Sequence, residues 1–168
     1  MSDRPIRATA REEGPRHRAS RRSAAERRAL DVYVKLHRAV SAIQARTNTF
    51  CGRHGLTVSQ FATLEVLYHK GPLCQRDVAS KILRSGGNLT LVVDNLEKSR
   101  LVERRVSQTD RREKVLHLTD EGRDLISRIF PEHASGIRSL MAELTGEEQE
   151  ELARLCRKLG RGVRERED

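Results

Sequence analysis

Polar side chains recur on one side of the segment 86–98. Its apolar residues recur at helical steps and would form the buried face of a helix: Leu89, Val92, Val93 and Leu96. The opposite face would then present Asn88, Thr90, Leu91, Asp94 and Asn95. An amide offers the paired donor and acceptor that match adenine, and Thr or Leu can touch the methyl group of thymine. The plainer alternative is an ordinary solvent-facing helix surface.

Arginines gather near the polar stretch 107–113, which separates two segments rich in Leu and Val. Residues 101–106 and 114–118 are β-prone, so we expect a two-stranded hairpin with a charged tip. The tip and its flank would carry Arg105, Asp110, Arg111 and Arg112. Guanidinium groups on a protruding loop suit a narrow, electronegative minor groove. This hairpin favours DNA contact over the solvent-facing alternative for 86–98.

The start of the 86–98 helix suits an anion. Ser85 is a good N-cap, and Gly86 and Gly87 allow close backbone approach to a phosphate at the free N–H groups. A shorter helix is predicted over 75–83. We add three of the polar residues on these two helices to the expected DNA contacts, namely Gln75, Arg76 and Lys98.

Charge and composition agree with a polyanion partner without requiring one. The 168 residues carry a formal net charge of +9, with 34 % charged and only 3 % aromatic residues. Residues 1–28 hold nine Arg against four acids and few aliphatic side chains, so we expect a disordered basic tail that turns helical near Ser23. The tail would attract phosphates or merely aid solubility. No apolar run is long enough to span a membrane, and the Arg-rich start lacks the apolar segment of a secretory signal.

The nucleophilic and metal-ligating residues do not form a catalytic pattern. The three Cys residues lack the paired spacing of a disulfide framework or a zinc site, and we expect no metal, no cofactor and a reducing cytoplasm. No triad, carboxylate pair or phosphate loop accompanies the six His residues, so we expect no enzyme. Arg53 and His54 beside Cys51 would lower its thiol pKa, although a small buried residue is the commoner role of such a cysteine. Cys156 is expected in the core.

Long helices flank this central region. An apolar periodicity runs from Leu30 to about Gly52, and capping-box patterns at Thr57–Gln60 and Thr145–Glu148 predict two further helix starts. Thr119 would cap a helix that Pro131 should kink or split. Two short helices followed at once by a hairpin are typical of a winged helix-turn-helix. The fold class is therefore mainly α with a small β-hairpin wing and flanking helices that form a dimerisation region.

The stretch from Leu56 to Phe130 resembles the MarR family, the multiple-antibiotic-resistance regulators. Three segments carry the likeness at suitable spacing: 55–60, 88–97 and 101–104. The most specific parts are Asp110-Arg111-Arg112 and then Leu118-Thr119-Asp120-Glu121-Gly122-Arg123. The segments 69–73, 85–88 and 129–131 are similar to the branch that includes quinone- and catechol-resistance repressors. Cys74 stands where Thr or Ser is usual, and Leu91 stands where many members carry Arg.

The resemblance implies a homodimer in which Asp110 orients Arg112 for entry into the minor groove. It also implies a small aromatic, often anionic, effector bound between the dimer helices and the DNA-binding lobe, or an oxidant sensed by Cys. The residues that we assign to effector or redox sensing are Tyr33, His37, Cys51, His54 and Phe61. The pair Tyr33 and His37 would face inward on the first long helix.

We therefore expect a basic tail over 1–28 and one domain over 29–164, with a DNA-binding lobe at about 56–119 and dimerisation helices at about 29–52 and 120–164. The expected function is a homodimeric, sequence-specific transcriptional repressor that binds a pseudo-palindromic operator in double-stranded DNA. The alternative is a non-specific or architectural DNA-binding protein in which the tail dominates.

Overall fold

The computed structural model describes residues 23–82, 86–107 and 113–164. The chain divides into two compact units, Met1–Ala39 and Val40–Asp168. The first helix, α1 (Ala24–Arg53), begins in the first unit and ends in the second. Its start is a capping box, because the Ser23 N–H donates to Glu26 Oε2 (2.6 Å) and the Glu26 N–H donates to Ser23 Oγ (3.1 Å). The predicted tail boundary at residue 28 therefore lies inside a helix.

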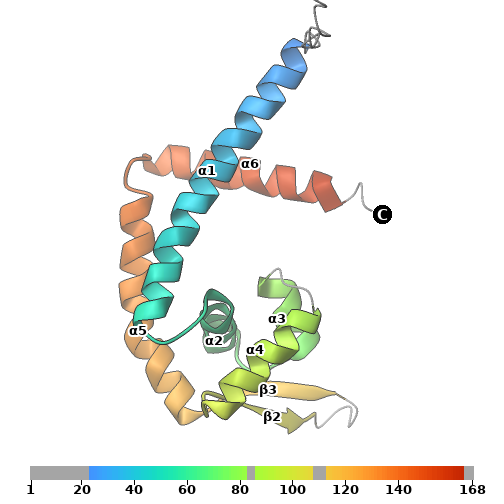
Figure 1. Cartoon of the computed structure of the whole chain (residues 1–168), viewed down its shortest axis with the longest axis vertical. Helices are drawn as coiled ribbons and strands as arrows, with labels where there is room; N and C mark the ends of the chain where they lie inside the picture. The colour runs from blue at the N-terminus through green and yellow to red at the C-terminus, as the bar shows by residue number, and fades with distance from the viewer. Residues whose placement is uncertain (1–22, 83–85, 108–112, 165–168) are drawn as a thin grey trace, which may run out of the picture. The chain divides into compact units, whose positions relative to one another are not determined.

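Three helices form the centre of the second unit: α2 (Val58–Lys70), α3 (Gln75–Ile82) and α4 (Gly86–Lys98). The predicted capping box at the start of α2 is confirmed, with Thr57 and Gln60 bonding each other's backbone N–H. Figure 1 shows these helices gathered above the strands. Their facing sides bury a core of aliphatic residues that includes Leu64, Val78 and Leu96. Burial of this core fixes which face of each helix is left for solvent.

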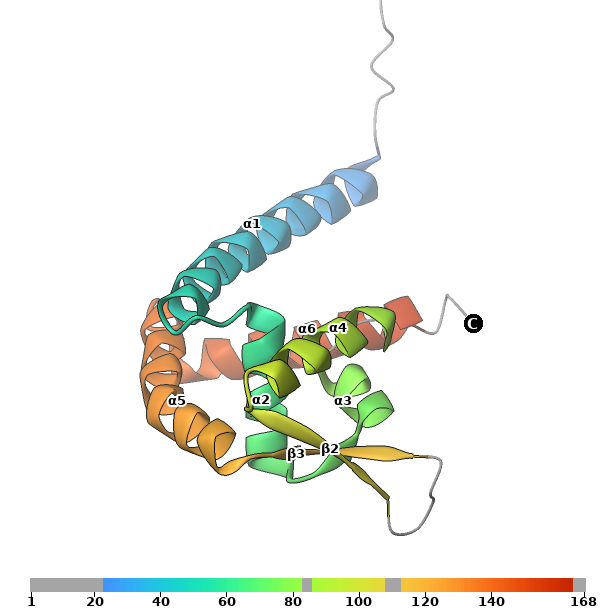
Figure 2. The same ribbon diagram turned by 60° about the horizontal axis from the view of Figure 1, so that its bottom comes forward.

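The sheet has three strands, one more than the predicted hairpin. β2 (Val102–Val106) and β3 (Lys114–Leu118) form the hairpin, with Arg104 opposite Leu116. The additional strand β1 (Leu73–Cys74) pairs antiparallel with β3, so the order is β1-β3-β2. The turned view in Figure 2 shows the hairpin extending beyond the helices. The predicted hairpin is confirmed, but the prediction of a two-stranded sheet missed the third strand, β1.

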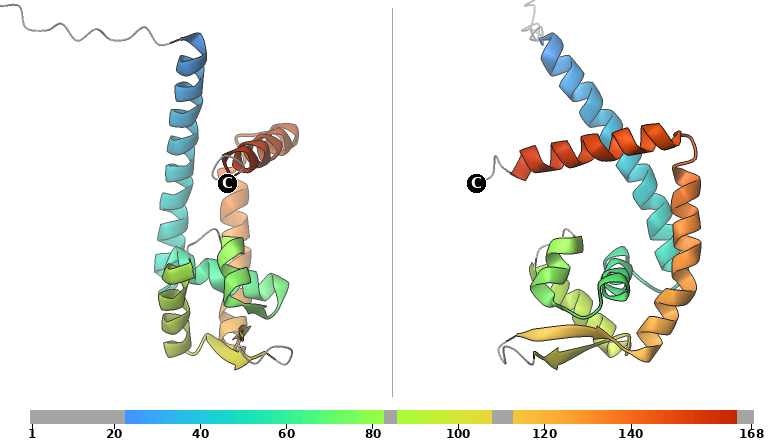
Figure 3. Two further views of the ribbon diagram at one scale, coloured as in Figure 1. Left: turned by 90° about the vertical axis from the view of Figure 1, so that its right-hand side faces the viewer. Right: turned by 180° about the vertical axis from the view of Figure 1, so that it is seen from behind.

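Two long helices follow the sheet. α5 (Asp120–Leu140) is capped by Thr119 as predicted and contains Pro131 without being split, although its ribbon curves in Figure 1. The predicted capping box of α6 (Gly146–Arg164) is also present, through Thr145 and Glu148. Figure 3 shows α6 turning sharply away from α5. None of the helices in the described residues is long and apolar enough to cross a membrane.

Candidate nucleic-acid interface

The two faces of α4 differ completely in burial. Leu89, Val93 and Leu96 are fully buried in the core. On the other side, Thr90 is exposed and Leu91 keeps 61 % of its surface accessible. A large exposed aliphatic side chain on an otherwise well-packed helix is available to touch a partner. The predicted assignment of the inward and outward faces of this helix is confirmed at these residues.

The starts of α3 and α4 are joined by a side-chain hydrogen bond. Gln75 Nε2 donates to Thr90 Oγ1 at 2.8 Å. This bond holds two of the predicted DNA-contacting residues side by side, while the Thr90 hydroxyl keeps its own proton to donate. Next to them, Arg76 is almost fully exposed and lies 3.7 Å from Glu113 at the base of the wing. A surface pair of this kind is weak, so the Arg76 guanidinium can readily exchange it for a phosphate.

Farther along α4, the polar residues that the helical period places on the outward face are only partly exposed. Asp94 is held by Arg104 of β2, with 2.7 Å between Oδ1 and Nη2. Asn95 is half-buried, whereas Lys98 at the end of the helix is exposed. Asp94 was predicted to face outward and contact DNA; it does point away from the core, but Arg104 of the neighbouring strand already occupies its carboxylate.

The described part of the wing presents one of its predicted arginines. Arg105 is exposed near the end of β2 and is paired with Glu103 on the same strand. The predicted tip residues Asp110, Arg111 and Arg112 lie outside the described residues, and so does Ser85. The predicted residues Gly86, Gly87 and Asn88 form the first turn of α4.

The start of α5 is bonded to the turn that follows α4. Thr119 Oγ1 donates to the carbonyl oxygen of Arg100 at 2.6 Å and accepts the Gly122 N–H at 3.0 Å. The Thr119 N–H donates to the Leu101 carbonyl oxygen at 3.3 Å. A Cβ atom on Gly122 would lie only 2.0 Å from that oxygen, so only glycine fits. The Leu-Thr-x-x-Gly motif is therefore a joint between the turn after α4 and the long helix α5.

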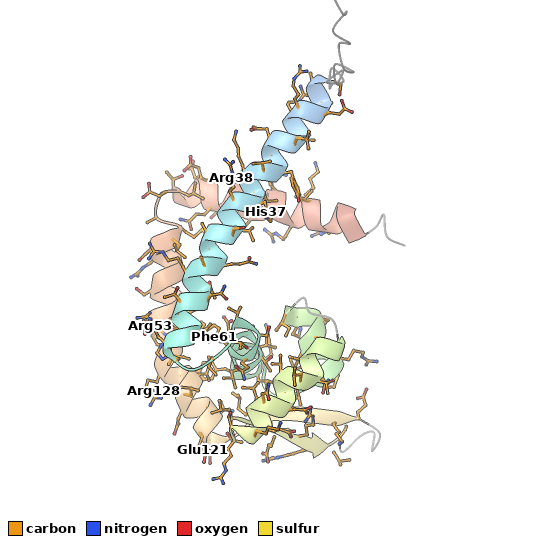
Figure 4. The ribbon with its side chains drawn as sticks, in the orientation of Figure 1. His37, Arg38, Arg53, Phe61, Glu121 and Arg128 are labelled. Atoms are coloured by element: carbon orange, nitrogen blue, oxygen red, sulfur yellow. The ribbon has the colours of Figure 1, made fainter. Side chains whose placement is uncertain are left out.

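The residues predicted to bind an effector differ in their burial and contacts. Tyr33 and His37 stack on each other on α1, 6.1 Å between ring centroids, and both are exposed rather than inward-facing. Phe61 is buried in the core, with its ring 4.6 Å from that of His133 on α5. Figure 4 labels Phe61 on α2 and His37 on α1. His54 Nε2 lies 3.4 Å from Glu132 Oε2 but is not aligned for a hydrogen bond.

A groove of about 800 Å³ lies between the end of α1 and the second half of α5. Positive and aromatic groups line it, including Arg46, Phe50, Arg53 and His133, and Glu132 holds Arg53 at 2.6 Å. None of the five predicted effector residues lines this groove, although Phe61 packs behind it against Phe50 at 5.4 Å. The sequence signal for it would have been Arg46, Phe50 and Arg53 at steps of four and three residues, which place them on one face of α1.

The three cysteines differ in their burial. Cys51 is only 1 % exposed, which confirms the predicted role of a small buried residue. Burial raises the pKa of its thiol, opposite to the lowering that the alternative expected from Arg53 and His54. Cys74 is half-buried, and Cys156 is exposed rather than in the core of this chain. Among the described residues, no group of three or more His, Cys, Asp or Glu side chains could hold a metal ion.

Residues 54–113 match the sequence model described as the MarR family. The chain is 37 % identical over 133 residues to the HTH-type transcriptional regulator MhqR of Bacillus subtilis, covering 79 % of this chain and 92 % of the relative. Its fold is similar to that of MepR from S. aureus in complex with DNA (TM-score 0.70, 27 % identity, 78 % and 97 % of the two chains). It is equally similar to BpsR of Bordetella bronchiseptica, whose DNA binding is regulated by 6-hydroxynicotinic acid (TM-score 0.70, 25 % identity, 77 % and 98 %). The chain belongs to the MarR family of winged-helix DNA-binding transcriptional regulators.

Proposed function

We propose that the protein is a repressor that reads a specific DNA sequence with the outer face of α4 and is released by a small aromatic ligand. The observation that carries the proposal is the two-sided α4, with Leu91 and Thr90 outward and the opposite face fully buried. A helix so fixed can enter the major groove without loss of core packing. Beside α4, the strand β2, which carries Arg105, would run along the sugar-phosphate backbone of the DNA toward the minor groove. This function involves no catalytic step and places the protein with the DNA in the cytoplasm.

We propose further that the functional form is a homodimer. α6 exposes Leu152, Leu155 and Leu159 at helical spacing, and α1 exposes Leu30, Val32, Tyr33, Val34 and Val40. Apolar stripes of this length on a soluble chain are typical of an interface. A second copy related by two-fold symmetry would bury them and place two α4 helices about 10 base pairs apart on a pseudo-palindromic operator.

The groove between α1 and α5 is the site that we propose for the effector. Arg46 and Arg53 supply positive charge, His133 and Phe50 supply aromatic surface, and hydroxyl groups such as that of Ser135 supply hydrogen bonds. This combination suits an aromatic acid or an ionised phenol. That BpsR responds to 6-hydroxynicotinic acid supports a ligand of this chemistry. Release by an oxidant is the alternative, for which Cys74 and Cys156 are the more accessible thiols.

The test compares two DNA duplexes. One is selected from a random pool by the protein itself, and the other is a scrambled version of equal length and composition. We expect clear preference for the selected duplex at physiological salt. Asn88→Ala should reduce that preference by about 1–3 kcal/mol, the value of a well-made base contact. Equal affinity of the wild type for both duplexes, with a steep salt dependence, would instead support the architectural alternative.

A pair of arginine variants tests the location of the interface. Arg105→Ala should weaken binding to both duplexes alike and reduce the salt dependence, because a backbone contact is lost. Arg128→Ala is the matched control, since Arg128 is an exposed arginine on the outer side of α5 (Figure 4). Equal effects of the two substitutions would refute the proposed wing contact.

A further inference from the structure

One guanidinium group joins the DNA-reading helix to the wing. Arg104 of β2 contacts two carboxylates of α4 at once, with Nη2 at 2.7 Å from Asp94 Oδ1 and Nη1 on Glu97 Oε2. Its backbone N–H also donates to Glu97 Oε1 at 2.9 Å. We call this set of three residues the Arg104 clamp. It lies outside the predicted DNA contacts, except for Asp94.

We propose that the Arg104 clamp is a positioning device that sets the orientation of α4 relative to the wing, so that sequence preference depends on residues that touch no base. The proposal rests on the proposed function, because it concerns how the same interface reads DNA. Asp94 thereby acts as an anchor of the helix, and the neighbouring Thr90 and Leu91 are left to meet the bases.

The backbone of Arg104 provides a rigid anchor. Arg104 is in register with Leu116 on the central strand β3, and Leu116 is fully buried. Asp94 and Glu97 are three residues apart, so both lie on the side of α4 that meets β2. Two contacts at different heights on the helix oppose both its rotation and its sliding. A planar fork can hold two carboxylates in this way, whereas a lysine ammonium offers no such geometry.

Partial burial strengthens the clamp. The Arg104 side chain is only 17 % exposed, although the carboxylates of Asp94 and Glu97 are more accessible. Ion pairs shielded from water are less screened by salt than surface pairs. The clamp should therefore persist at the ionic strength at which the protein binds DNA. An exposed ion pair such as Arg105 with Glu103 is more strongly screened by salt at that ionic strength.

If Asp94 and Glu97 act only through their charge, neutralising them has the opposite effect on DNA binding from the effect expected if they position α4. Asp94 and Glu97 place negative charge on a helix that approaches phosphates. If they acted only through charge, neutralising either one would tighten binding to every duplex. If they hold the helix in place, the same change loosens the reading geometry, and the preference for the selected duplex falls.

The experiment measures affinity of the full chain for the selected and the scrambled duplex in Glu97→Gln, Asp94→Asn and Arg104→Lys. We expect each variant to lose roughly fivefold or more of the preference, as is usual for coupled charge networks. Glu103→Gln is the matched control, because it removes one carboxylate from the same strand without touching the clamp. It should leave the preference unchanged. Unaltered preference in Glu97→Gln and Asp94→Asn, or equal tightening on both duplexes, would overturn the proposal.

A measurement without DNA separates this proposal from the proposed function. The Arg104 N–H should exchange with solvent faster in Glu97→Gln than in the wild type, because its acceptor carboxylate is weakened. Unchanged exchange would refute the clamp even if DNA binding fell. Faster exchange, together with a wild type that prefers no duplex, would leave the clamp standing and refute the sequence-specific function.

Discussion

Gly122 is the position where an added methyl group should be most damaging among the described glycines whose surroundings are given by the structure. The added Cβ would lie 2.0 Å from the Leu101 carbonyl oxygen, which is backbone and cannot swing aside as a side chain can. Overpacking costs about 1–3 kcal/mol in typical cores. If α5 shifts to relieve it, the hydrogen bonds of Thr119 to Arg100 and Leu101 are strained as well, at about 0.5–1.5 kcal/mol each.

Against these losses stands the better helix propensity of alanine, worth about 1 kcal/mol. We therefore expect Gly122→Ala to lower the free energy of unfolding by about 2–4 kcal/mol. Urea unfolding followed by circular dichroism measures this as a lower midpoint at matched protein concentration. Gly136→Ala is the control on the same helix, because a Cβ at that position meets nothing within 4 Å. Equal midpoints for Gly122→Ala and Gly136→Ala would refute the reasoning.

Three further predictions test other parts of the structure. Thr57→Ala removes the cap of α2 and should cost about 1 kcal/mol in urea unfolding, whereas Thr49→Ala, an exposed position near the end of α1, should cost less. Leu155→Asp should convert the dimer to a monomer in light scattering and abolish specific DNA binding, while Arg157→Asp on the opposite face of α6 should leave the dimer intact. Because burial raises the pKa of the Cys51 thiol, Cys51 should resist maleimide at neutral pH until denaturant is added, and rapid labelling of the native protein would contradict its burial. The same shift means that any stability which Cys51 contributes is fully present below the thiol pKa of the unfolded chain and is lost as pH rises above it.

Local signals predicted the helices well. The capping patterns at Thr57 and Thr145 place the starts of α2 and α6 correctly, and the helix predicted over 86–98 coincides with α4. These features depend on residues close together in sequence, where propensity and capping act directly. The strand β1 was missed because two residues, Leu73 and Cys74, are too few to show a period.

Long-range partners explain the remaining errors. The helical period correctly places Asp94 away from the core, but it contains no information about Arg104 on another strand. The neighbours of Cys51 in sequence are cationic, yet desolvation dominates its pKa. Cys156 lies on an apolar stripe of α6. Such a stripe indicates that this face of the helix is buried, but it does not indicate whether the residues that bury it belong to the same chain.

The short strand β1 also affects the order in which the lobe can form. It pairs with β3, and the chain between them contains α3, α4 and β2. Closing so long a loop costs conformational entropy before the hydrogen bonds between β1 and β3 can form, and this cost slows folding. During synthesis, β1 has no strand to pair with until β3 has left the ribosome. Competence to read DNA should therefore arise late, in a single step, and a nascent chain that ends before residue 118 should have none of it.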